Sequence, residues 1–173
     1  MAGSLVLIQE TTVSSGVSSV SLTGIDSNFD VYKVVYNNLV QADNNVDVNI
    51  RFINSSGSDI TSSEYDRAQM YLRASTTFLN RAGSNQAQGQ IVEAGGNNTN
   101  EQSNGVLYIF NANNSSEFTF YTNEGGYTNI STDLIGGQGG GVLTSAEQVT
   151  GITFLMGTGN ITSGGFKLYG LVK

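Results

Sequence analysis

Residues 151–172 decide the fold class, and they read Gly-Ile-Thr-Phe-Leu-Met-Gly-Thr-Gly-Asn-Ile-Thr-Ser-Gly-Gly-Phe-Lys-Leu-Tyr-Gly-Leu-Val. Apolar residues alternate with other residues on both sides of a turn rich in Gly, Asn, Ser and Thr; they are Ile152, Phe154 and Met156, then Phe166, Leu168 and Val172. Successive side chains of a strand point to opposite faces, so each run has one apolar face. A helical periodicity of 3.6 residues fits neither of the two runs. We therefore predict a β-hairpin that places two strands in the core of a β-sandwich.

Other stretches of the chain show the same strand patterns. Residues 46–52 alternate strictly, which predicts an inward apolar face (Val46, Val48, Ile50, Phe52) and a wet face (Asp47, Asn49, Arg51). Residues 29–36 are apolar on both faces, which is typical of a central strand. Residues 5–10 suit an edge strand, and residues 106–110 and 117–122 a hairpin.

Three stretches are less regular. Residues 64–75 could begin as a capped helix, but their alternation favours a strand. Residues 80–105 are polar and rich in Gly, Asn and Gln, which predicts a long loop, and residues 136–141 (Gly-Gly-Gln-Gly-Gly-Gly) predict another. We expect one domain over residues 1–173, an all-β antiparallel β-sandwich of jelly-roll type with about eight to ten short strands.

The composition indicates a folded chain and argues against two classes of binding partner. Of 173 residues 38% are hydrophobic and only 12% charged, so the low hydrophobicity is not combined with the high charge typical of disorder. The net charge is −7, and the seven basic residues are scattered rather than gathered in a stripe. Binding to nucleic acid or to an anionic membrane is therefore not expected.

The N-terminus has no basic segment before its short apolar run, and no apolar run is long enough to cross a bilayer. We expect neither a signal peptide nor a transmembrane segment. The chain has no Cys, so no disulfide framework is needed and folding in a reducing cytoplasm is feasible. It also has no Pro, one of the usual guards of edge strands, which favours edges covered by another subunit.

The sequence predicts no enzyme, cofactor or metal site. Without His or Cys, Ser-His-Asp and Cys-His catalysis and zinc binding are not expected. Paired carboxylates could still serve a glycosidase, but the acids are scattered singly. The alternating run from Asp43 to Asn49 resembles the start of a calcium loop, yet Val48 and Asn54 stand where Gly and Glu are required. Calcium held by other loop oxygens stays open. Residues 136–141 lack the Lys-Ser/Thr of a phosphate-binding loop.

Three tyrosines are the candidate contact residues. Tyr65, Tyr121 and Tyr127 stand beside Asn, Glu and Asp in or near expected loops. Aromatic faces flanked by amides are typical of sugar-binding sites and of protein interfaces, although a partly buried tyrosine gives the same pattern.

Three stretches of the chain together resemble a known protein family. The first combines residues 11–15 with residues 22–32, of which the latter read Leu-Thr-Gly-Ile-Asp-Ser-Asn-Phe-Asp-Val-Tyr. The second is residues 63–66 (Ser-Glu-Tyr-Asp), and the third is residues 159–171 (Gly-Asn-Ile-Thr-Ser-Gly-Gly-Phe-Lys-Leu-Tyr-Gly-Leu). The set resembles small structural proteins of tailed bacteriophages, in particular marine and cyanobacterial phages. The resemblance covers most of the chain and includes no catalytic residue. It implies a jelly-roll-like module assembled on the head surface, the neck or the tail.

The expected function is therefore that of a non-enzymatic virion structural protein, made in the bacterial cytoplasm and incorporated into the particle as head decoration, neck or tail/fibre component. Its expected partners are other virion proteins and copies of itself, with a trimer favoured. The alternative is a carbohydrate-binding module that recognises a host-surface glycan.

Overall fold

A computed structural model describes residues 5–75 and 78–172, and these residues form twelve strands and no helix. The strands are β1 (Leu5–Val13), β2 (Ser19–Thr23), β3 (Val31–Gln41), β4 (Val46–Asn54), β5 (Tyr65–Arg73), β6 (Leu79–Gln86), β7 (Gly89–Gly95), β8 (Ser103–Phe110), β9 (Thr119–Thr128), β10 (Leu134–Leu143), β11 (Val149–Met156) and β12 (Ile161–Leu171). Consequently, no helix in the described part of the chain could cross a membrane.

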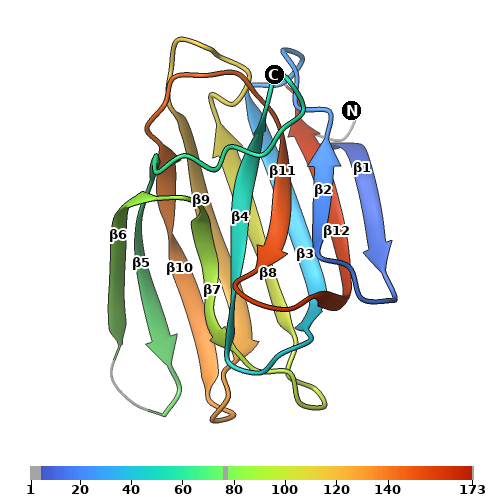
Figure 1. Cartoon of the computed structure of the whole chain (residues 1–173), viewed down its shortest axis with the longest axis vertical. Helices are drawn as coiled ribbons and strands as arrows, with labels where there is room; N and C mark the ends of the chain where they lie inside the picture. Colours follow the sequence, from blue (N-terminus) through green and yellow to red (C-terminus); the bar gives the residue numbers. More distant parts are fainter. Residues whose placement is uncertain (1–4, 76–77, 173) are drawn as a thin grey trace.

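The strands form two antiparallel sheets that pack face to face (Figure 1). The larger sheet has the order β1-β12-β3-β8-β9-β10-β5-β6, and the smaller has the order β2-β11-β4-β7. The prediction of an all-β antiparallel sandwich is confirmed, although the described residues contain more strands than expected.

The connectivity is nested. Strand β1 pairs with β12, β2 with β11, β3 with β8, and β4 with β7, while the chain alternates between the sheets over its first four strands. The hairpins β5–β6 and β9–β10 are inserted into this scheme, and both extend the larger sheet beyond β8. The face formed by these four strands carries the site described below.

One apolar core fills the space between the sheets. Val48, Ile50 and Phe52 of β4 are buried, as the alternation of this strand predicts, but Asn49, expected on the wet face, is buried as well. Strand β3, predicted to be central, lies between β12 and β8. The edge position of β1, the strand at residues 65–73 and the hairpin β8–β9 are likewise confirmed.

The prediction that residues 151–172 form a hairpin is wrong. Strand β11 pairs with β2 and β4 in the smaller sheet, whereas β12 pairs with β1 and β3 in the larger one. The Gly-rich segment between them therefore crosses from one sheet to the other, and Phe154 meets Phe166 across the core with 5.0 Å between ring centroids. Val172, expected in the core, is exposed because it lies beyond the last paired residue of β12.

Two predicted loops are strands. Residues 80–105 include most of β6, all of β7 and the start of β8, because backbone pairing outweighs their polar composition. Residues 136–141 lie within β10, which is paired on both sides. Its glycines make room for large neighbours: a Cβ built on Gly137 would lie 3.2 Å from the Tyr71 ring, and one on Gly141 would lie 2.5 Å from the Tyr121 hydroxyl.

Candidate functional site

The predicted contact residues Tyr65, Tyr121 and Tyr127 are buried, with exposed fractions of 1%, 1% and 4%. They point inward from the larger sheet, so the prediction that they offer aromatic faces to a partner or glycan is wrong. The Tyr65 hydroxyl accepts a hydrogen bond from the Phe52 N–H (2.9 Å) and donates to the Ile60 carbonyl (3.1 Å), which ties β5 to β4. Burial raises the pKa of all three hydroxyls above the ordinary 10.0.

The outer face of the extended sheet carries a groove that runs across the strands. The registers place four small side chains side by side on β6, β5, β10 and β9, and these are Ala82, Ala68, Gly140 and Thr122. Adjacent strands are about 4.8 Å apart, so this row is roughly 14 Å long. We call the depression over this row the transverse groove.

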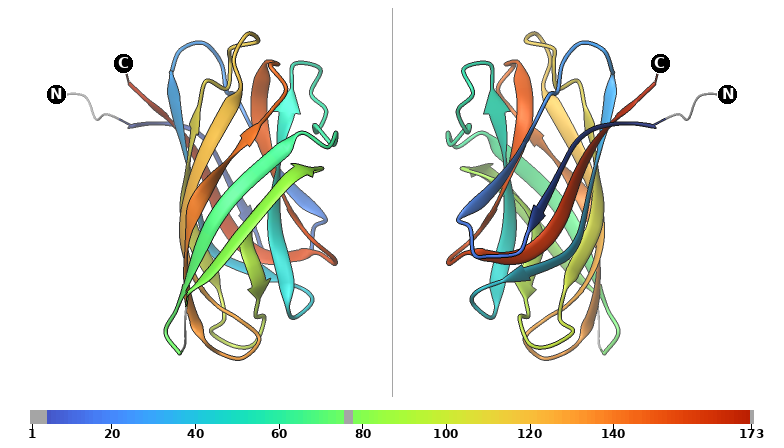
Figure 2. Two further views of the ribbon diagram at one scale, coloured as in Figure 1. Left: turned by 90° about the vertical axis from the view of Figure 1, so that its left-hand side faces the viewer. Right: turned by 90° about the vertical axis from the view of Figure 1, so that its right-hand side faces the viewer.

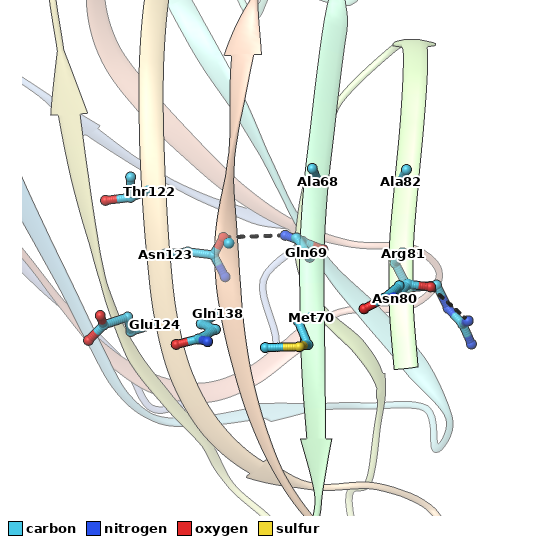
Figure 3. Close-up of a pocket in the computed structure, with 11 residues that line it drawn as sticks. Ala68, Gln69, Met70, Asn80, Arg81, Ala82, Thr122, Asn123, Glu124 and Gln138 are labelled. Atoms are coloured by element: carbon cyan, nitrogen blue, oxygen red, sulfur yellow. Dashed lines mark hydrogen bonds between the residues drawn. The ribbon is translucent and has the colours of Figure 1, made fainter. Parts of the chain in front are cut away.

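Two rows of larger side chains flank the floor of the groove. On one side Met70, Gln138 and Glu124 lie in register with Asn80 of β6 (Figure 3). This polar wall presents amides, one carboxylate and one thioether.

The opposite wall is apolar and aromatic. It contains Val142, Phe120 and Phe110, which are cross-strand neighbours on β10, β9 and β8. Phe120 is 47% exposed although it is a large apolar side chain. An exposed apolar surface of this kind, formed by neighbouring side chains, is typical of a binding site.

The groove consists of two neighbouring hollows. One, about 760 Å³, lies toward the polar wall, and the other, about 510 Å³, lies toward the aromatic wall; both are bordered by Ala68 and Thr122. The row of the floor continues to Tyr108, whose ring lies 5.5 Å from Lys33 Nζ. Glu124 is the acid of the polar wall, and Asp66 borders the aromatic end.

The underside of the same strands is polar as well. Gln69 is buried beneath the groove, accepts a hydrogen bond from the Tyr71 hydroxyl (2.8 Å) and donates to Asn123 Oδ1 (3.3 Å) and to the Gln90 carbonyl (Figure 3 shows the Asn123 bond). These bonds join β5 to β9 and to β7 of the smaller sheet. They fix the register of the strands that carry the groove.

A second exposed surface lies at the opposite edge of the larger sheet. Leu5, Val6 and Leu7 of β1 are 43%, 43% and 50% exposed, and among the described strands β1 pairs with β12 alone. Figure 2 shows the start of β1 and the end of β12 leaning away together from the body of the sandwich. We call the exposed side of β1 over these three residues the β1 edge.

Acidic side chains form no metal-binding group of three within the described ranges. In the calcium-loop look-alike, Asp47 instead accepts a hydrogen bond from the Ala94 N–H (2.9 Å), and Asn45 adopts a left-handed backbone conformation (φ 64°). These contacts bind β4 to the end of β7.

The groove could not be predicted from the sequence because its parts come from five strands, two of which were expected to be loops. The available signal was the alternation of residues 66–72, where Ala68, Met70 and Leu72 share one face. In comparisons with known proteins, no protein family, curated protein or solved structure matches this chain.

Proposed function

We propose that this chain is a non-enzymatic structural protein of a tailed-bacteriophage particle, and that its copies join through the β1 edge. The observation that carries the proposal is the exposure of Leu5, Val6 and Leu7 on a strand with one free edge. Val6 faces the side opposite to Leu5 and Leu7, so apolar surface is exposed on both faces of the strand. A strand or loop of a second copy would cover both faces and the free backbone groups together.

The guards that usually protect an edge strand are incomplete here. The chain has no Pro, and the pair formed by Lys167 and Glu10 (3.0 Å) borders only the second half of β1. The bulge between Leu7 and Gln9 lies at the end of this first half, whose residues Leu5–Leu7 keep a regular register with β12. The first half of β1 therefore remains open to pairing, which supports assembly over a solitary chain.

The nested strand order supports a jelly-roll interpretation. Four pairs, β1–β12, β2–β11, β3–β8 and β4–β7, follow the scheme of a long hairpin rolled into two sheets, which is how jelly rolls of viral capsid proteins are built. Together with the sequence resemblance, this order favours a particle component, as head decoration, neck or tail/fibre protein. We favour a closed assembly such as a trimer, because a closed assembly leaves no β1 edge free.

The proposal is tested on purified particles of the phage that carries this gene. Mass spectrometry of gradient-purified particles is expected to find the chain in a fixed ratio to the major head protein. A phage enzyme made in the same infection serves as the control for contamination. If the chain is absent from the particles, or no more abundant than that control, the proposal is wrong.

A further inference from the structure

We infer that the transverse groove binds a neutral polysaccharide laid across strands β6, β5, β10 and β9. The inference goes beyond the structural role proposed above and does not depend on it, because the groove and the β1 edge lie at opposite ends of the larger sheet.

The walls match the two kinds of surface of a sugar ring. The C–H face of a pyranose is apolar and packs on an aromatic ring, while its hydroxyls need amide or carboxylate partners. Phe120 and Phe110 supply the aromatic surface on one side, and Gln138, Asn80 and Glu124 supply donors and acceptors on the other. A purely apolar ligand would leave this polar wall unpaired.

The charge favours a neutral ligand over an anionic one. Glu124 and Asp66 border the groove, and its two arginines are bound to neighbouring side chains. Arg67 donates to Gln69 Oε1 (3.2 Å), and Arg81, on the edge strand β6, pairs with Glu93 of the smaller sheet. Lys33 lies beyond the end of the floor, over Tyr108. With a net charge of −7 on the whole chain, a sulfated or phosphorylated polymer is disfavoured.

The floor fits an extended chain of rings. Ala68 and Gly140 carry little or no side chain, and the row continues across four strands, roughly 14 Å. An open groove of this shape accepts the middle of a polymer as well as its end. We therefore expect binding to polysaccharides to exceed binding to single sugars.

The experiment uses affinity electrophoresis and calorimetry of the full chain with dextran, mannan, xylan and laminarin as neutral probes and dextran sulfate as the anionic comparator. At least one neutral probe is expected to bind. Phe120→Ala should weaken that binding about tenfold, the equivalent of ~1.4 kcal/mol. Ala68→Phe, which fills the floor and removes none of the groups proposed to contact the ligand, should weaken it at least as much. Leu134→Ala, exposed on β10 away from the groove, should leave it unchanged.

Thermal unfolding of each variant shows whether it is folded, and Ala68→Phe keeps the test decisive if Phe120→Ala is unstable. The inference is overturned if no neutral probe binds, if only dextran sulfate binds, or if binding survives both groove variants. It is also overturned if the groove variants change the oligomeric state, because the groove would then be a protein interface. A negative result here does not contradict the proposed structural role, because the particle experiment that tests this role does not involve the groove.

Discussion

Replacement of Gly141 by alanine tests the packing of β10 against the interior tyrosines. The added Cβ would lie 2.5 Å from the Tyr121 hydroxyl and 2.5 Å from the Asp66 carbonyl oxygen, so the ring and the neighbouring strand must both shift. Overpacking of this kind costs about 1–3 kcal/mol. The alanine also lowers the conformational entropy of the unfolded chain, which stabilises the fold by about 0.4–1 kcal/mol. The expected net loss in the free energy of unfolding is therefore about 1–2 kcal/mol.

Gly136 on the same strand is the matched control. A Cβ there would point to the outer face, and its nearest neighbour would be the Leu72 Cβ at an ordinary 3.7 Å. Gly136→Ala is therefore expected to be neutral or to stabilise by up to about 1 kcal/mol. Urea unfolding followed by circular dichroism measures both variants, with the midpoint shifting and the slope unchanged. If both lie within about 0.5 kcal/mol of the parent, residues 136–141 behave as a loop and the reasoning is refuted.

Three further predictions concern the core and the buried polar groups. Phe154→Ala removes a fully buried ring that packs on Tyr36 and Phe166, and should cost about 3–5 kcal/mol in urea unfolding; a loss below about 1 kcal/mol would contradict its place in the core. Gln69→Ala should cost about 1–3 kcal/mol, because it leaves the Tyr71 hydroxyl without its partner, and an unchanged midpoint would show that the bond is unimportant. Alkaline pH should destabilise the fold, since burial raises the pKa of six tyrosines above 10.0 (Tyr32, Tyr36, Tyr65, Tyr71, Tyr121, Tyr127). Their contribution is complete below about pH 10, where unfolded tyrosines begin to ionise, and is lost as the pH rises toward the folded pKa values; equal stability at about pH 9 and 11 would refute it.

Periodicity predicted the strands of the central sandwich because their apolar faces meet the core. Val46, Val48, Ile50 and Phe52 were placed correctly for this reason, since each packs between the sheets. The same pattern could not show which strands pair. The closing strands look like a hairpin locally, but the core is completed when Phe154 and Phe166 face each other from different sheets.

The inward face of the extension escaped prediction because its pattern of polar and apolar residues is inverted. In β5 the polar Gln69 points inward beside Tyr71, while Ala68 and Met70 face the groove. Buried amides are tolerated there because they bond to one another, a long-range condition that residue types do not reveal. Two of the three candidate tyrosines were misplaced for a related reason. Inward Gly141 leaves space for the Tyr121 ring and inward Gly137 for the Tyr127 ring, which a loop-like sequence does not suggest.

Sedimentation velocity of the full chain tests most directly the claim that this protein assembles through the β1 edge. The parent chain is expected to form an oligomer, with a trimer favoured. Leu5→Lys combined with Leu7→Lys should dissociate it to monomers, because charges replace exposed leucines on a strand that must pair. Leu134→Lys, a matched change at an exposed leucine of β10, should sediment like the parent chain. A parent chain that stays monomeric, or a double variant that still assembles, would contradict the claim.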